Sequence, residues 1–228
     1  MSFTKKIYED NIINNVEKIN KTTTDDIDIT PLLDLIDATL DVLEKISIFD
    51  NEISEFWNEI SSDVIASVYS ATSGFYRQAI ITLRNILEIG CLSFFYLDHK
   101  IEYHLFKSHD AKADKYVSVL IREFNFFTTN YIHAFYLDIK SKQSSVNSIS
   151  NYLSSLYKQL SDIVHGRYKT LTKKSKLLIS YDRESFHFFI DKFKSVIGIL
   201  VAMYILRYND KENMKLIEIA NSTGAVCL

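Results

Sequence analysis

Turn-forming residues are scarce in this chain. Its 228 residues include five glycines and a single proline, Pro31. Sheet-rich folds need many tight turns, and glycine and proline are residues that tight turns favour. The shortage therefore favours long helices joined by short links, in one large domain or two small ones that bury a substantial core.

Cysteine is scarce as well, and neither charge sign predominates. Cys91 and Cys227 lie far apart in the sequence, which excludes a metal-type spacing and argues against a disulfide framework. The formal net charge of −3 argues against a globally basic nucleic-acid-binding protein but leaves a local basic patch open. These features favour a cytoplasmic protein.

The sequence has no apolar run long enough to span a bilayer. The longest run, residues 196 to 206, would extend about 16 Å as a helix, whereas the hydrocarbon core of a bilayer is about 30 Å thick. Glu9 and Asp10 lie where a signal peptide would have its apolar segment. We therefore expect no membrane association.

Hydrophobic periodicity predicts helices along most of the chain. Residues 3 to 19 are expected to form the first helix, and the polar residues 22 to 28 a linker. Thr30 before Pro31 predicts the start of the next helix, with Thr30 as its N-cap. Further long helices are expected over residues 50 to 70, 75 to 97, 146 to 164 and 184 to 208.

These helices predict an all-α fold, an antiparallel helical bundle with additional short helices. Residues 1–28 are assigned as an N-terminal helix and linker, and residues 29–228 as a single helical bundle domain. The second half of the helix over residues 75 to 97 is apolar almost all round, so we expect this helix at the centre of the bundle. The aromatic content of 13% exceeds what one core is expected to hide, which predicts a homodimer or another protein partner.

Three ionisable residues lie on one edge of the central helix. Arg77, Arg84 and Glu88 are separated by seven and four positions, spacings that place side chains on the same side of a helix. One interpretation is a surface ion pair between Arg84 and Glu88, worth about 0.3–0.5 kcal/mol. Because this helix is expected to be buried, the alternative is a functional site that holds its charges for chemistry.

His165 is the second candidate site residue. It is followed by Gly166, a residue typical of helix C-termini, where the carbonyl ends favour a cation. The histidine is therefore either a helix cap or a general acid or base, because imidazole exchanges protons near neutral pH. Lys158 precedes it on the same helix, and Arg167 just beyond the turn is placed to stabilise phosphate charge.

A basic segment follows His165. Residues 167 to 176 are the only local run of positive charge. Cationic side chains neutralise phosphates, and an aromatic ring can stack on a base. The segment is therefore a candidate RNA-binding surface. The alternative is a solvated loop. The candidate RNA-binding residues are Lys158, Tyr168, Lys169, Lys173 and Lys174.

Other patterns that carry chemistry are weak or missing. Acidic and histidine residues gather between positions 98 and 109, but without the helical spacing of a metal site. Arg183 is the only arginine that is closely followed by a histidine, His187, with three residues between them. The sequence has no glycine-rich phosphate loop and no nucleophile elbow. We therefore expect no metal and no cofactor.

Two segments resemble the HEPN superfamily of bacterial helical domains. The first is YRQAIITLRNILE at residues 76–88, and the second is YKQLSDIVHG at residues 157–166. The resemblance implies a bundle that covers roughly residues 50 to 208. Members of the superfamily often dimerise, and many are metal-independent endoribonucleases of toxin–antitoxin or phage-defence systems that place an arginine four to six residues before a catalytic histidine.

The resemblance implies that His165 is the catalytic histidine and Glu88 the acidic residue near it. The chain departs from the family pattern, since Lys158 rather than an arginine precedes His165, with six residues between them. Arg84 or Arg167 would then supply the positive charge. The function implied is an RNA-cleaving protein or, alternatively, a non-catalytic interaction module such as an antitoxin, an immunity protein or a complex subunit. This interpretation expects His165 and the charged edge of the central helix, with Arg84 and Glu88, to face one water-accessible crevice.

Overall fold

The computed structural model describes residues 3–110, 116–123, 127–136, 139, 149–165 and 179–228. These residues form helices and connecting turns without a β-strand, so the all-α prediction is confirmed. The helices, in chain order, are α1 (Phe3–Tyr8), the π-helical segment η1 (Glu9–Ile13), α2 (Asn14–Asp26), α3 (Thr30–Phe49), α4 (Asn51–Thr72), α5 (Tyr76–Asp98), α6 (Lys100–Lys107), α7 (Val117–Glu123), α8 (Thr129–Phe135), α10 (Ile149–Val164), α12 (Arg183–Tyr208) and α13 (Met214–Asn221).

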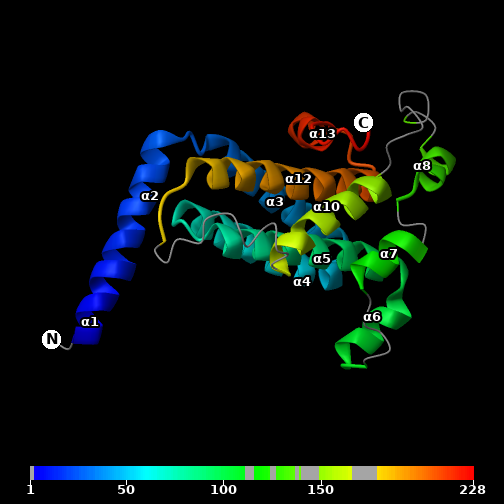
Figure 1. Cartoon of the computed structure of the whole chain (residues 1–228). Helices are drawn as coiled ribbons and strands as arrows, with labels where there is room; N and C mark the ends of the chain where they lie inside the picture. Colours follow the sequence, from blue (N-terminus) through cyan, green and yellow to red (C-terminus); the bar gives the residue numbers. More distant parts are fainter. Residues whose placement is uncertain (1–2, 111–115, 124–126, 137–138, 140–148, 166–178) are drawn as a thin grey trace.

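The longest described helices, α3, α4, α5 and α12, form the body of the molecule (Figure 1). Helix α5 packs against α4, α12 and α10, which gives it the central place that the sequence predicts. Helix α3 packs against α4 and α12, and α13 lies on α12. The short helices α6, α7 and α8 lie at one end of the body, while α1, η1 and α2 leave it at the other end (Figure 1).

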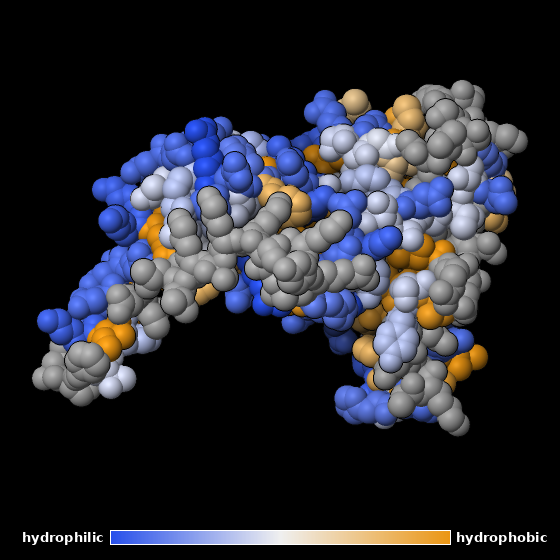
Figure 2. Space-filling view, in the orientation of Figure 1, coloured by the Kyte–Doolittle hydropathy of each residue, from blue (hydrophilic) through white to orange (hydrophobic). Residues whose placement is uncertain are grey.

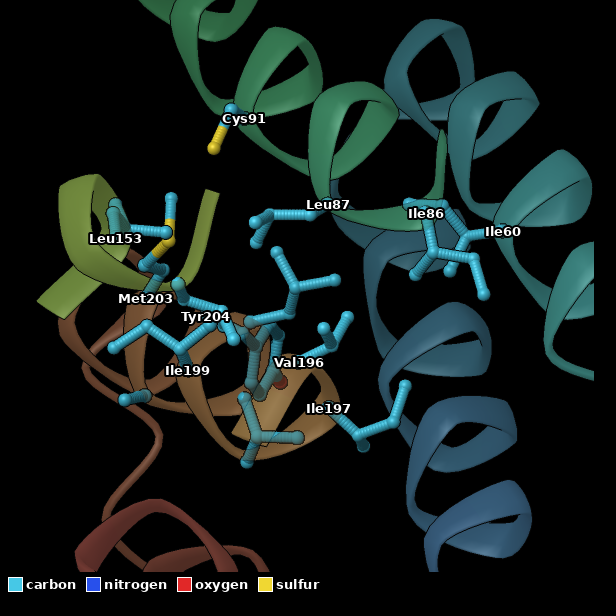
Figure 3. Packing of buried hydrophobic residues seen from close by; sticks show 14 of the residues in the cluster. Ile60, Ile86, Leu87, Cys91, Leu153, Val196, Ile197, Ile199, Met203 and Tyr204 are labelled. Atoms are coloured by element: carbon cyan, nitrogen blue, oxygen red, sulfur yellow. The ribbon is translucent and has the colours of Figure 1, made fainter. Parts of the chain in front are cut away.

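The core extends through the body and includes the region where α5 meets α10 and α12. Figure 3 shows Leu87 of α5, Leu153 of α10 and Met203 of α12 gathered in it, and all three are fully buried. Gly90 allows α5 and α12 to approach closely, because a Cβ atom at this position would lie 2.4 Å from Cδ2 of Leu200. Removal of these apolar side chains from water is the main favourable contribution to folding.

The N-terminal helix is longer than predicted. Residues 22 to 28 are expected as a linker, but α2 continues to Asp26. The hydroxyls of Thr22 and Thr23 donate to backbone carbonyl oxygens one turn earlier, and the buried Thr23 hydroxyl also contacts the carbonyl oxygen of Thr72. These contacts satisfy the polar side chains inside a helix, so packing on α4 outweighs the weak helix preference of threonine.

The start of α3 also differs from the prediction. Thr30 is the first helical residue rather than the N-cap, and its backbone N–H donates to the Asp28 carboxylate at 2.9 Å. Hydrogen bonds with Thr30 lower the pKa of Asp28, so the aspartate supplies the cap. Pro31 lies in the first turn as predicted, where an α-helix needs no backbone donor.

Helix α5 is the one described helix that is long and apolar enough to cross a membrane by length and composition alone. Within its most apolar window, 56% of the residues are buried inside the bundle. The core helix of a soluble protein has the same properties, so this helix is weak evidence for a membrane span.

Candidate functional site at the α5–α10 seam

Helix α10 runs antiparallel to α5 along one side of the body. Near the middle of α10, Tyr157 contacts Arg84 and Glu88. At the end of α10, the carbonyl group of Val164 contacts Arg77, which lies two turns earlier on α5 than Arg84. We call these five residues the α5–α10 seam. The seam joins the charged edge of α5 to the helix that leads into the candidate histidine.

Arg84, Glu88 and Tyr157 form a closed hydrogen-bonded triangle. Nη2 of Arg84 donates to Oε1 of Glu88 and to the hydroxyl oxygen of Tyr157, each at 2.9 Å. The Tyr157 hydroxyl donates to the same Glu88 oxygen at 2.9 Å. The side chains of Arg84 and Glu88 are 21% and 28% exposed, so the triangle is partly shielded from water and is worth more than a fully exposed ion pair.

The triangle keeps Arg84 charged. Partial burial alone would lower the pKa of Arg84, but the hydrogen bond with Tyr157 and the negative charge of Glu88 outweigh it, so the pKa lies above its ordinary value. The Arg84 guanidinium also lies over the Tyr157 ring, with Cζ 5.2 Å from the ring centre, a position that favours a cation. The charge of Arg84 is thus balanced inside the protein.

Arg77 contacts the end of α10. Its Nη2 donates to the carbonyl oxygen of Val164 at 3.2 Å. Carbonyl groups in the last turn of a helix have no partner within the helix, and they favour a nearby cation. Arg77 therefore fixes the chain directly before His165, which is exposed and whose backbone N–H donates to the Ser161 carbonyl oxygen at 2.9 Å.

His165 and Arg84 lie at different points along the seam. Tyr157, the contact of Arg84, precedes His165 in the sequence by about 12 Å along a helix axis. The structure therefore brings Arg77 next to the residue preceding the candidate histidine, and it places the predicted Arg84 and Glu88 about two turns away.

Two polar atoms of α5 and α10 are buried without a hydrogen-bond partner among the described residues. They are Oγ of Ser161 and Nε of Arg84. Ser161 lies one turn beyond Tyr157, on the same side of α10. Buried polar atoms are normally hydrogen-bonded, and each exception calls for a water, an ion or a ligand contact. The seam thus has unused hydrogen-bonding capacity between Tyr157 and the end of α10.

A hollow of about 330 Å³ lies between α7 and α10, on the side of Tyr157 away from His165. This volume falls at the small end of the range for ligand pockets. The lining has hydroxyl and amide groups, one aliphatic side chain and no charge: Ser118, Ile121, Ser150, Asn151, Ser154 and Tyr157. Tyr157 connects this hollow to the charged triangle.

The other predicted site residues fall into two groups. Lys158 is exposed on α10, directly after Tyr157. The residues predicted in the basic segment lie outside the described part of the chain, so their proposed roles stay predictions: Arg167, Tyr168, Lys169, Lys173 and Lys174.

The close arginine–histidine pair lines a separate hollow. Arg183 and His187, at the start of α12, face Asp26 and Asp28 at the turn between α2 and α3. Nε of Arg183 lies 3.7 Å from the Asp26 carboxylate. This arginine is therefore engaged in an ion pair that joins α12 to the N-terminal helix.

Within the described residues, no group of three histidine, cysteine, aspartate or glutamate side chains is placed to hold a metal ion. Two members of the acidic and histidine group between positions 98 and 109 have structural contacts instead. Asp98 forms an ion pair with Arg207, and the His99 ring stacks on the Phe95 ring at 3.9 Å between centres.

Among the seam residues that contribute a side chain, Tyr157 is the one that the sequence analysis does not identify. A signal is present, because Tyr157, Ser161 and His165 follow at intervals of four and therefore lie along one side of a helix. The sequence gives no opposite helix, however, and an aromatic residue at helical spacing is normally assigned to the core.

Comparisons with protein-family models, with curated proteins and with solved structures give no match to this chain.

Proposed function

We propose that this chain is a metal-independent endoribonuclease of the HEPN-like type, which acts in the bacterial cytoplasm in phage defence or as the toxin of a toxin–antitoxin system. The observation that supports it best is the 3.2 Å contact between Arg77 and the Val164 carbonyl oxygen. This contact holds a guanidinium beside the helix end that leads into the exposed His165. A cation and an imidazole at one surface are the groups that cleavage of a phosphodiester beside a ribose hydroxyl requires.

In the proposed reaction, the His165 imidazole removes the proton of a ribose 2′-hydroxyl. The 2′ oxygen attacks the neighbouring phosphorus, the bond from phosphorus to the 5′ oxygen breaks, and that oxygen leaves with a proton from water. The products are a 2′,3′-cyclic phosphate and a 5′-hydroxyl end. A preorganised donor to the charge that develops on the phosphate contributes about 2.7–4 kcal/mol to such a step.

Arg77 is the residue we assign to the phosphate. An arginine has five N–H donors, and the contact with Val164 uses one of them. Lys158 and the basic segment from Arg167 onward are assigned to the RNA backbone, where each cation displaces a counterion. The triangle of Arg84, Glu88 and Tyr157 holds α10 against α5 and so positions His165 without touching the reacting atoms.

A non-catalytic interaction module is the second candidate, and one observation favours it. Arg84 and Glu88 form an ion pair and both bond to Tyr157, so these two charges hold α10 against α5. In this case the chain is an antitoxin, an immunity protein or a complex subunit. It would bind a partner stoichiometrically, and His165→Ala would leave that binding intact.

Expression in a bacterial host separates the two candidates. An endoribonuclease inhibits growth when it is expressed, and His165→Ala and Arg77→Ala each relieve the inhibition at equal protein levels. His187→Ala is the matched control, because His187 is also an exposed histidine but lies on α12 outside the seam. Growth inhibition that persists unchanged in the soluble His165→Ala protein would rule out the assignment of His165 as the base.

A further inference from the structure

Helix α3 carries two mainly apolar stripes, displaced from each other by one residue. The first stripe is buried in the core, and its residues alternate at spacings of three and four positions: Leu32, Leu35, Thr39, Val42 and Ile46. The second stripe repeats this spacing: Leu33, Ile36, Leu40, Leu43 and Ser47. One residue turns an α-helix by about 100°, so the second stripe lies on another side of α3. A helix that packs on a core needs a single apolar stripe.

The second stripe, which we call the outer stripe, is open to solvent along its centre. Leu33 and Leu40 are 48% and 43% exposed, while Ile36 and Leu43 are half-buried at the margin of the core. Large aliphatic side chains at alternating spacings of three and four form the seam by which one helix packs on another. From Leu33 to Ser47 the outer stripe has the length of about two heptads, which fits the apolar face of one further helix.

A row of carboxylates borders the outer stripe. The row has the same spacing, displaced by one further residue: Asp34, Asp37, Asp41 and Glu44. None of the four lies in the first turn of α3, where the helix dipole would favour acidic residues. Lys215 of α13 lies 3.4 Å from Asp34 and 3.9 Å from Asp37, and the row has no other ion pair within the described residues. The acidic row therefore keeps an excess of negative charge beside the outer stripe.

The charge of the acidic row selects the class of partner. Carboxylates repel the phosphates of nucleic acids and the headgroups of anionic lipids. A second copy of α3 would add four more carboxylates to the same seam, and charges of one sign oppose association. A cationic helix, in contrast, places lysine or arginine side chains beside the row while its apolar face covers Leu33 and Leu40.

The outer stripe and the α5–α10 seam lie on different sides of the body. Helix α3 packs on α4 and α12, and it lies behind α12 in Figure 1, whereas α10 lies in front. Figure 3 likewise shows α3 and α10 on opposite sides of the buried residues. Over α10 and α12, Figure 2 shows mainly hydrophilic and intermediate residues with small apolar patches. A partner on the outer stripe therefore leaves the seam uncovered.

We propose that the outer stripe of α3, together with the acidic row, is a docking site for a cationic amphipathic helix of another protein. The apolar face of that helix packs on Leu33 and Leu40, and its cationic side chains lie beside the acidic row. The site is about two heptads long, so binding is weak and decreases with added salt. This proposal does not depend on the reaction assigned to His165.

Two synthetic helical peptides test the docking site in the full-length protein. Both consist of about three heptads with leucine at the a and d positions, and they differ in carrying either lysine or glutamate at the e and g positions. The labelled peptide is kept at nanomolar concentration, so that it stays monomeric, and fluorescence anisotropy at low salt measures its affinity for the protein. We expect micromolar binding of the lysine peptide, about tenfold tighter than binding of the glutamate peptide.

Two double variants separate the apolar contribution from the charge. Leu33→Ser with Leu40→Ser removes the exposed part of the outer stripe, and we expect the lysine peptide to bind about tenfold more weakly. Asp41→Lys with Glu44→Lys reverses half of the acidic row, and we expect this variant to bind the glutamate peptide more tightly than the lysine peptide. Circular dichroism shows whether each variant is folded, and the gain of binding to the glutamate peptide does not depend on the leucine variant.

Matched controls make the same changes on other exposed helices. Ile101→Ser with Leu105→Ser removes exposed apolar residues of α6, and Asp10→Lys with Glu17→Lys makes the same change of charge on the N-terminal helical segments. Both controls should bind the two peptides like the wild type.

Three results overturn the proposal. The first is a wild type that binds the lysine peptide no more tightly than the glutamate peptide. The second is a pair of α3 variants that bind both peptides like their controls. The third is a wild-type dimer in light scattering that the leucine variant dissociates, because a second copy of the chain would then be the occupant of the outer stripe.

Discussion

Tyr157 on α10 donates to Glu88 on α5 across 2.9 Å, and the same glutamate oxygen accepts from Arg84. One tyrosine hydroxyl therefore closes the contact between the central helix and the helix that leads into the candidate histidine. The first prediction follows from this relationship.

Tyr157→Phe removes the hydroxyl and keeps the ring. Glu88 loses a donor and Arg84 loses an acceptor, so we expect the free energy of unfolding to fall by about 1–2 kcal/mol. Urea unfolding followed by circular dichroism measures this change. Tyr69→Phe is the matched control, because the Tyr69 side chain is 65% exposed, and it is expected to unfold like the wild type. Equal stability of the two variants would contradict the role assigned to the triangle.

Arg77→Met tests the contact with the end of α10. The global stability should change by less than about 1 kcal/mol, because the arginine is exposed and a single such hydrogen bond contributes little. Local opening should increase, since the last carbonyl groups of α10 lose their partner. Hydrogen exchange at the backbone amides of residues 161 to 165 measures this opening. Exchange that is unchanged there would show that Arg77 does not fix the helix end.

Gly90→Ala tests the close approach of α5 and α12. Alanine favours a helix by up to about 1 kcal/mol relative to glycine, but the added Cβ atom would lie 2.4 Å from the fully packed Leu200 side chain. Overpacking of this kind costs about 1–3 kcal/mol, so we expect a net loss of stability in thermal unfolding. When Leu200→Val is also present, Gly90→Ala should lower the stability by less than it does beside leucine. If Gly90→Ala alone is more stable than the wild type, the Leu200 side chain moves aside at little cost in free energy.

Asp210→Asn should change stability in a pH-dependent way. Burial alone would raise the pKa of Asp210, but hydrogen bonds from Lys45 and Tyr204 outweigh it, so the pKa lies below its ordinary value. A carboxylate with a lowered folded-state pKa stabilises the fold above its unfolded-state pKa of about 3.9, and it loses that contribution as the pH falls through the folded-state value. The substitution should therefore cost about 1–3 kcal/mol at pH 7.

The same comparison at low pH provides the control for Asp210. The difference between wild type and Asp210→Asn should shrink as the pH falls below about 4, in urea unfolding carried out at a series of pH values. A difference that stays constant across this range would mean that the side-chain shape, rather than the charge, accounts for the effect.

The main helices could be predicted from the sequence because their apolar spacing is regular and proline and glycine are rare. The extension of α2 to Asp26 could not, since Thr23 is helical only through its packing beside Thr72 of a distant helix. The candidate site likewise has a part that the sequence predicts and a part that it does not. The edge of Arg84 and Glu88 follows from helical spacing, whereas the choice of Tyr157 as their partner depends on the packing of α10 on α5, which no single segment encodes.

The central claim is that His165 acts as a base at the end of the α5–α10 seam. The most direct measurement is cleavage of RNA by the purified wild-type protein in the presence of a metal chelator, with analysis of the product ends. The account predicts fragments with 2′,3′-cyclic phosphate and 5′-hydroxyl ends, and no fragments from an equally folded His165→Ala protein. Intact RNA with the wild type, or the same fragments from His165→Ala, would contradict it.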